Sequence, residues 1–506
     1  MNFVSNKMAA IVLAAAIGAS ALATGPVNVW ASSGTQATAA GLGFQDINED
    51  GASSAAIQEL LKQGVMNGYG NGLVKPNAAV TRAELAKLVV TALGLPINAA
   101  QPAGVTDLAA GKWYHDYVAT LVNLGVMLPE GGLLKPNEPA TAEELAGVVS
   151  KALKRDVASV QYWAKNVGVK AESVTRGELA QLVVTSQQAK PSTDATVAEI
   201  KVLNTITLEI TFSEPLTPED AALDQALKNF SFSNGLTMLN VPQLKTGSIS
   251  TYIVPTSPQK AEASYDLTYK GKSAGSFVGS GEKIEMSSAG QVSFDTFEVE
   301  SELSKGVTDY GNVISAYSVG RAAIAFVLNE NNQYNGNTYE IISSMRAKQV
   351  TITPEGGAPM QATYVLFTQA TDGRQAPKFR LPAGSVLTPG VKYTVTSEWS
   401  NIANGTFVAK EIAPLELASA KALNDSSLEL TLKEDPKDEL FAVRSIELTG
   451  TDGSKLTAAY KLTSRKGATG IFELASGSKL AAGMTYKVNA VSGWATGSDI
   501  AVTLSE

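Results

Sequence analysis

The stretch from Val80 to Gly94, VTRAELAKLVVTALG, carries the clearest helical pattern in the chain. Thr81 and Glu84 have the spacing of a capping box, in which the threonine hydroxyl accepts from the Glu84 N–H and the glutamate carboxylate accepts from the Thr81 N–H. Gly94, followed by Pro96, provides a stop. The apolar residues that recur at helical spacing between these signals are Leu85, Leu88, Val89 and Leu93. The pattern predicts a short amphipathic helix.

The same capping box returns twice, as TAEEL from Thr141 and as TRGEL from Thr175. GLVKPNAAVTRAEL, from Gly72, also aligns without a gap on GLLKPNEPATAEEL, from Gly132. This is an internal repeat of about 60 residues. Each unit predicts a helix, a turn-rich loop and a second helix, and the third copy has a shortened loop. In the first copy we expect Ser53 or Ser54 to cap a helix that ends at Gly64.

Beyond the polar stretch QQAKPSTD the hydrophobic period changes from helical to two, which marks a domain boundary. Ile206, Leu208, Ile210 and Phe212 alternate with polar residues and predict a half-buried strand. The segment around it, EIKVLNTITLEITFSEP, is echoed by SAKALNDSSLELTLKEDP and predicts two copies of one hairpin. LTPGVKYTV and LAAGMTYKV place Tyr393 and Tyr486 at the same offset, with a fainter version at Tyr265. This pattern resembles the tyrosine-corner strand of immunoglobulin-like sandwiches.

Composition and the start of the chain narrow the class of protein. With 506 residues and 44% hydrophobic residues, several separate cores are expected. The absence of cysteine excludes disulfides, cysteine metal sites and thiol chemistry. Lys7, an apolar run from Met8 to Ala23 and a small-residue site at Ala31 predict a secretory signal, with a retained membrane anchor as the alternative.

FQDI at Phe44, GVMNGYGNG, LVKPN and TRAE together resemble the S-layer homology module, which anchors proteins to the envelope of Gram-positive bacteria. The resemblance covers about residues 43–185. It implies that three copies form a pseudo-threefold prism around a helical bundle. It also implies that grooves between copies hold a secondary cell-wall polymer bearing a pyruvylated amino sugar, with the motif arginine on the ketal carboxylate.

Two arginines, Arg82 and Arg176, stand at the first helical position after a capping threonine, where capping does not require them and the helix dipole disfavours a cation. We expect them to point outward and bind an anion together with the helix N-terminus, the alternative being solvated surface arginines. Residues 41–190 hold 14 acidic and 13 basic residues, so the overall field attracts no anionic polymer. Because Ala142 replaces arginine in copy two, we expect two competent grooves at most. The resemblance adds weaker ligand-binding candidates: Asp46, Asp107, Gly72, Gly132 and Trp113.

Other signals for chemistry are poor. Asp46, Asn48, Asp50 and Gly51 spell half a calcium loop, but Ile57 stands where a bidentate glutamate is needed, and turn formation explains them. His115 is the only histidine in the sequence, and no nucleophile elbow, P-loop or HExxH motif accompanies it. We therefore predict no enzyme, no metal and no cofactor. For the tryptophans Trp399 and Trp494, packing is favoured over a role as carbohydrate platforms.

The expected fold class is multidomain: an all-α pseudo-threefold set of S-layer homology repeats followed by three all-β immunoglobulin-like sandwiches. The expected boundaries are a signal peptide at 1–31, repeats at 41–96, 102–154 and 155–186, a linker at 187–195, and sandwiches at 196–290, 291–411 and 412–506. We expect a secreted protein of a Gram-positive cell wall, anchored non-covalently to a pyruvylated secondary cell-wall polysaccharide, with lateral self-association into an S-layer through the sandwiches. The alternatives are an anchored adhesin or glycan-binding protein and an anchored hydrolase. Neither nucleic acid nor a membrane span after signal removal is expected.

Overall fold

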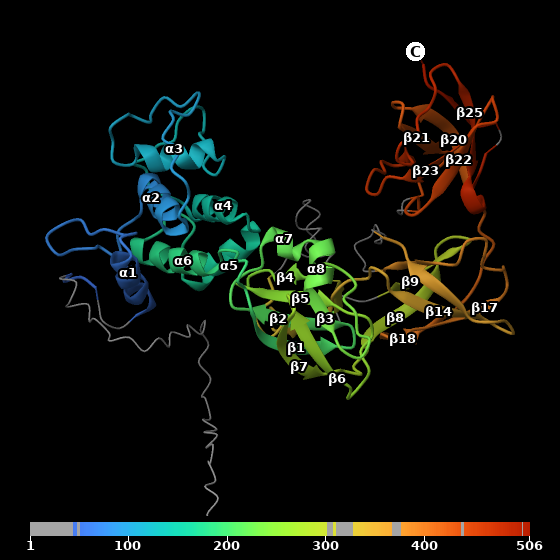
Figure 1. Cartoon of the computed structure of the whole chain (residues 1–506), viewed down its shortest axis with the longest axis horizontal. Helices are drawn as coiled ribbons and strands as arrows, with labels where there is room; N and C mark the ends of the chain where they lie inside the picture. Colours follow the sequence, from blue (N-terminus) through green and yellow to red (C-terminus); the bar gives the residue numbers. More distant parts are fainter. Residues whose placement is uncertain are drawn as a thin grey trace, which may run out of the picture.

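The computed structural model describes residues 44–47, 51–300, 307–309, 327–366, 376–436, 440–497 and 499–505. The expected signal peptide lies outside these residues, as do Asn48 and Asp50 of the half calcium loop. Within the described residues a helical N-terminal region precedes a series of β-sheets (Figure 1).

Each of the three repeats contributes two helices. These are α1 (Ala52–Lys62) and α2 (Arg82–Leu93), α3 (His115–Asn123) and α4 (Ala142–Leu153), and α5 (Val157–Asn166) and α6 (Arg176–Gln188). The capping boxes predicted at the starts of α2, α4 and α6 are all formed. Helix α2 ends at Gly94 in the left-handed conformation, as its sequence predicts.

The prediction for the start of α1 is wrong. This helix begins at Ala52 with Gly51 as its N-cap, so Ser53 and Ser54 both lie in its first turn and cap nothing. The Ser53 hydroxyl instead accepts a hydrogen bond of 2.7 Å from the Gln181 amide on α6. The serine therefore joins the first repeat to the third.

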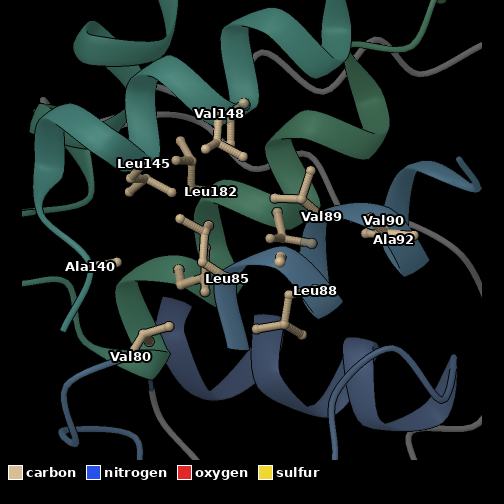
Figure 2. Packing of buried hydrophobic residues seen from close by; sticks show 14 of the residues in the cluster. Val80, Leu85, Leu88, Val89, Val90, Ala92, Ala140, Leu145, Val148 and Leu182 are labelled. Carbon is tan, nitrogen blue, oxygen red and sulfur yellow. The ribbon is translucent and has the colours of Figure 1, made fainter. Parts of the chain in front are cut away.

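The three repeats share one hydrophobic core. Leu85, Leu145 and Leu179 each follow the glutamate of a capping box, and each is at most 1% exposed. Figure 2 shows Leu85 of α2 and Leu145 of α4 pointing towards Leu182 of α6. Because all three repeats contribute to this core, no repeat encloses it alone. Truncating one of these buried leucines to alanine costs about 2–5 kcal/mol.

Backbone hydrogen bonds link the repeats in cyclic order just before the capping threonines. The N–H of Val80 donates to the carbonyl of Val174 at 2.8 Å, and the N–H of Val174 donates to the carbonyl of Ala140 at 3.3 Å. The cycle closes with the N–H of Ala140 donating to the carbonyl of Val80 at 2.8 Å. These bonds fix the starts of α2, α4 and α6 relative to one another, so the first residue of each helix faces a neighbouring repeat.

The first β region contains two small sheets and two short helices. One sheet has the order β1 (Val197–Asn204), β2 (Thr207–Phe212), β5 (Thr251–Pro255), β4 (Gln243–Leu244); the other has β3 (Phe230–Phe232), β6 (Ser264–Tyr269), β7 (Lys272–Val278). Helices α7 (Pro218–Ala221) and α8 (Leu223–Asn229) lie between β2 and β3 in sequence. Strand β2 is confirmed, but it is buried on both faces, because its polar residue Glu209 forms an ion pair of 3.1 Å with buried Lys245.

The next two β regions have the same strand order. The second is an eight-stranded sheet, β18 (Ser400–Asn404), β8 (Ile284–Gln291), β9 (Thr296–Glu300), β16 (Lys378–Arg380), β15 (Met360–Tyr364), β14 (Gln349–Pro354), β17 (Lys392–Thr396), β19 (Thr406–Val408). The third is β26 (Ala495–Thr496), β20 (Leu415–Ala422), β21 (Ser427–Leu432), β24 (Thr469–Leu474), β23 (Lys455–Tyr460), β22 (Ser445–Gly450), β25 (Thr485–Ala490), β27 (Ala501–Thr503), with a short helical turn at Val491–Gly493. The expected boundary at residue 290 falls inside β8, which pairs with β9 and β18 of the second sheet. Short pairs β10 (Val307–Asp309) with β13 (Glu340–Ile342) and β11 (Gln333–Tyr334) with β12 (Asn337–Thr338) complete the described strands.

Local details bear out the repeated sequence patterns. Ile200 pairs with Ile210 across the β1–β2 hairpin, and Ala420 pairs with Leu430 at the corresponding place in β20–β21. The three patterned tyrosines each accept a hydrogen bond at the hydroxyl from the backbone N–H five residues earlier, at 2.9–3.0 Å: Tyr265, Tyr393 and Tyr486.

The two C-terminal tryptophans pack inside the sheets, as predicted. Trp399 and Trp494 are 2% and 1% exposed. Their indole N–H groups donate to the carbonyls of Gln349 and Ser445. A buried indole cannot serve as a carbohydrate platform.

Candidate functional site at the junctions between repeats

Arg82 begins α2 and lies at the junction between the first and second repeats. Its Nη1 atom is 2.8 Å from Oε1 of Glu144, the capping-box glutamate of the second repeat. The Arg82 side chain is 12% exposed, and its Nε atom is buried without a hydrogen-bond partner among the described residues. The ion pair offsets the unfavourable position of a cation at a helix N-terminus.

Arg176 begins α6 and lies at the junction between the third and first repeats. Its Nη1 atom is 3.1 Å from Oε1 of Glu84, the capping-box glutamate of the first repeat. Its Nε donates to the carbonyl of Val74 at 2.8 Å and its Nη2 to the carbonyl of Asn67 at 2.7 Å. The guanidinium also lies over the ring of Tyr69, 4.6 Å from the centroid. Arg176 is 4% exposed.

Neither arginine points outward as expected, and neither is the solvated surface arginine of the alternative, because Arg176 is 4% exposed and the Arg82 side chain 12%. Each helix start lies against the next repeat, so the first side chain of the helix is enclosed by that repeat. Each arginine is neutralised by the capping-box glutamate of the neighbouring repeat. The two carboxylate oxygens of this glutamate have different partners. In Glu144, Oε2 accepts from the Thr141 N–H at 3.0 Å, while Oε1 faces Arg82.

The third junction lacks the arginine. Ala142 begins α4, and its N–H donates to the carbonyl of Ala171 in the third repeat. The glutamate that corresponds to Glu84 and Glu144 is Glu178, whose Oε2 accepts from the Thr175 N–H at 2.8 Å. Helix capping is therefore conserved within the chain at all three junctions, whereas the ion pair forms at two.

The acidic candidates shape loops. The carboxylate of Asp46 accepts from the N–H groups of Val74 and Lys75, at 2.9 and 2.7 Å, and Asp107 accepts in the same way from Leu134 and Lys135. Burial raises the pKa of Asp46, but these N–H donors outweigh it and hold the pKa below its ordinary value.

The glycine candidates form turns. Gly72 and Gly132 have φ values of 71° and 84°, and a Cβ on Gly132 would lie 2.9 Å from the carbonyl oxygen of Gly104. The carbonyls of Gly72 and Gly132 accept hydrogen bonds from backbone N–H groups near the start of their repeats, those of Gln45 and Thr106. These contacts account for the glycines without a ligand.

Trp113 is 57% exposed and meets the ring of Tyr114 edge-on at 5.4 Å. It precedes α3, whereas Trp163 lies within α5, so the tryptophans of the second and third repeats do not occupy equivalent places. Trp163 is buried and donates to the carbonyl of Gly247 in the first β region at 2.7 Å.

Sequence reasoning missed Tyr69. This residue is 48% exposed and its hydroxyl donates to Oε1 of Glu84, the same oxygen that faces Arg176. The guanidinium of Arg176 lies over its ring, and the Nζ of Lys75 lies 5.1 Å from the ring centroid. An aromatic residue inside the turn-forming run NGYGNG is the signal that marks it.

His115 starts α3 and contacts Asp116 and Gln101. Among the described residues, no group of three or more histidine, cysteine, aspartate or glutamate side chains is placed to hold a metal ion. No described helix has the length and apolar character needed to cross a membrane.

Comparison with known proteins identifies the first two helical repeats. The family model of the S-layer homology domain matches residues 43–86 and 106–146. The chain carries S-layer homology domains. It is 26% identical over 223 residues to an S-layer protein of Bacillus thuringiensis subsp. finitimus, a match that covers 38% of this chain and 27% of that relative. The matched region thus spans about a quarter of the length of that relative.

Two further matches are more limited. An amylopullulanase of Thermoanaerobacterium thermosulfurigenes is 25% identical over 125 residues, covering 25% of this chain and 6% of that enzyme. The solved structure of domains 1–6 of the surface layer protein SbsC matches 71% of this chain and 62% of that chain, at 12% identity and a TM-score of 0.15. That likeness is too slight to carry an argument. The S-layer homology domains and the S-layer relative indicate a surface protein of the S-layer type.

Proposed function

We propose that this chain is a secreted surface protein of a Gram-positive bacterium that is held non-covalently on the cell wall by its S-layer homology repeats. The ligand is a secondary cell-wall polysaccharide whose pyruvylated amino sugar presents a carboxylate. The observation that supports this proposal is the ion pair between Arg82 and Glu144, which places a guanidinium and a carboxylate at the junction of two repeats.

The chemistry of the junction suits a carboxylate ligand. A guanidinium presents five N–H donors in a fixed fork that matches a carboxylate. In the unbound chain Glu144 occupies one side of the Arg82 fork. A ketal carboxylate takes the remaining donors or replaces Oε1 of Glu144, while Oε2 keeps its hydrogen bond to Thr141 and the helix stays capped.

The repeats at 41–96, 102–154 and 155–186 form a pseudo-threefold unit in this proposal, and the cyclic bonds among Val80, Ala140 and Val174 support it. The β regions are immunoglobulin-like sandwiches without catalytic function that pack laterally in an S-layer. The common strand order of the second and third regions and the three tyrosine hydroxyl bonds support a repeated sandwich.

Sedimentation with cell walls tests the proposal. The full chain is mixed with wall fragments that carry a pyruvylated polysaccharide, and with the same fragments after mild acid has hydrolysed the ketals. Retention on the first and release from the second is the expected result. Equal retention on both kinds of fragment contradicts the proposed ligand, and no retention on either contradicts wall anchoring.

A further inference from the structure

We infer that the three junctions between repeats have different functions, and that the junction of Arg82 with Glu144 alone binds the cell-wall polymer. Arg176 is a structural residue that fastens the third repeat to the first. This inference rests on the proposed function and assigns that function to one junction.

The hydrogen bonds of Arg176 leave little capacity for a ligand. Its Nε, Nη1 and Nη2 atoms all have partners, and these include the carbonyls of Val74 and Asn67, which belong to the backbone and cannot be exchanged for a ligand without moving the loop. One face of the guanidinium is covered by Tyr69. The N–H groups of the Arg176 guanidinium therefore have acceptors within the protein, and Tyr69 covers one face of its plane.

Arg82 has the same position in its repeat but far fewer partners. Its side chain makes a single ion pair, with Glu144, and no other hydrogen bond, ion pair or ring contact of this side chain occurs within the described part of the chain. Its buried Nε retains an unpaired N–H donor, which is costly unless a ligand or solvent reaches it. An anion at this junction would supply that acceptor.

The glutamates that pair with the two arginines also differ, because Glu84 has more partners and is less exposed than Glu144. Oε1 of Glu84 accepts from both Arg176 and Tyr69, and its side chain is 14% exposed. Oε1 of Glu144 has Arg82 as its partner, and its side chain is 31% exposed. An incoming carboxylate therefore displaces one contact at Glu144, whereas at Glu84 it would also have to displace a buried arginine and a tyrosine hydroxyl.

The loop sequences explain this difference. The first repeat has the turn NGYGNG, which supplies Tyr69 and the carbonyl of Asn67, whereas the second repeat has the shorter LPEGG at the same place. The shorter loop contains no aromatic residue to cover a guanidinium. At the remaining junction Ala142 provides no guanidinium at all.

The inference predicts one binding site per chain and separable roles for the two arginines. The test titrates the full chain with a synthetic pyruvate ketal of an N-acetylhexosamine by isothermal calorimetry. The expected stoichiometry is one. Arg82→Gln is expected to weaken binding at least tenfold and to lower the unfolding temperature of the helical region only slightly, by the loss of one ion pair. Arg176→Gln is expected to lower that temperature and change the affinity of the folded chain less than twofold.

Arg346→Gln is the matched control, because it removes the same charge from an exposed arginine in the second β region. Should Arg176→Gln fail to fold, Arg176→Lys keeps the charge and is compared in its place. A stoichiometry of two, or a tenfold loss of affinity in a folded Arg176 variant, overturns the inference and leaves wall anchoring intact. Absence of binding by the unaltered chain, together with no retention on wall fragments, overturns the proposed function and this inference with it.

Discussion

Arg82 on the first repeat lies 2.8 Å from the carboxylate of Glu144, which at the same time caps the second helix of the second repeat. One glutamate thereby supports a helix start and neutralises a cation from the neighbouring repeat. Arg176 and Glu84 repeat the relationship between the third repeat and the first. The S-layer homology motif thus encodes contacts between repeats as well as helix caps.

Glu144→Gln is predicted to tighten binding of a carboxylate ligand about threefold to tenfold, because a glutamine keeps the oxygen that accepts from Thr141 but leaves Arg82 without a competing anion. Calorimetric titration of the full chain measures the change. Glu143→Gln is the control, because Glu143 is the exposed neighbour in the same helical turn. A weaker affinity in the Glu144 variant would show that the glutamate contributes to ligand binding rather than opposing it.

Ala142→Arg is predicted to restore the third ion pair, with Glu178 as its partner. A partly buried pair of this kind stabilises by roughly 0.5–1 kcal/mol, since its entropy cost and screening offset much of the attraction. Differential scanning calorimetry of the full chain should show a higher transition temperature for the helical region. Ala142→Gln, similar in length but uncharged, serves as the reference. Equal transition temperatures in the two variants would mean that position 142 does not reach Glu178.

Gly247→Ala is predicted to loosen the joint between the third repeat and the first β region. The Gly247 carbonyl accepts from Trp163, and a Cβ at this position would lie 2.4 Å from Val327 and 2.9 Å from Tyr162. Gly247 also has a φ of 87°, which disfavours any residue with a Cβ. Hydrogen exchange of the backbone around Trp163 is expected to accelerate.

Gly477→Ala separates the two effects, because Gly477 has a similar φ of 82° but open space around its Cβ position. It is expected to leave exchange near Trp163 unchanged. If exchange is also unaltered in the Gly247 variant, the contact between the third repeat and the first β region accommodates the added methyl group, and the prediction is wrong.

Lys348 should make stability depend on pH. It is 2% exposed, and its Nζ donates to the carbonyl of Thr256, which belongs to the first β region. Burial lowers the pKa of Lys348 to about 7, from an unfolded value near 10.5. Between these two values the unfolded chain binds more protons, so the free energy of unfolding rises with pH from about 7 to about 10.5.

Lys348→Met is therefore predicted to stabilise the chain by roughly 3–5 kcal/mol at pH 6, since one pKa unit corresponds to about 1.4 kcal/mol, and by progressively less as the pH approaches 10. Calorimetry of both proteins across this range checks the trend. Lys421→Met, at an exposed position of β20, should show no such dependence. A difference between Lys348→Met and the unaltered chain that stays constant with pH would contradict a buried titrating amine.

Local rules predicted the helices well, and the contacts of their first residues poorly. Thr81 and Glu84 form a capping box because the interaction spans three residues and needs no tertiary structure. The burial of Arg176 depends on carbonyls of Val74 and Asn67, about 100 residues away in the sequence, and no local pattern reports such a contact. The alternation of polar and apolar residues in β2 likewise predicted only one buried face. The second face is buried because Glu209 pairs with Lys245, a residue distant in sequence.

The repeated sequence carried more information than any single copy. Comparison of the boxes at Thr81, Thr141 and Thr175 separated the capping residues, which persist, from the arginine position, which varies. It could not show that the glutamate of one box neutralises the arginine of another, because the cyclic order of the repeats is a property of the fold. The backbone hydrogen bonds among Val80, Ala140 and Val174 establish that order, and Figure 2 shows buried residues of the core that the repeats share.

Sedimentation of the full chain with pyruvylated wall fragments tests the central claim most directly, with the Arg82→Gln variant and the Arg346→Gln control run in parallel. The account predicts that the unaltered chain and the control sediment with the fragments, while at least nine-tenths of the Arg82 variant remains in solution at the same protein concentration. Retention of the Arg82 variant at the level of the control would contradict the assignment of wall binding to the junction between Arg82 and Glu144.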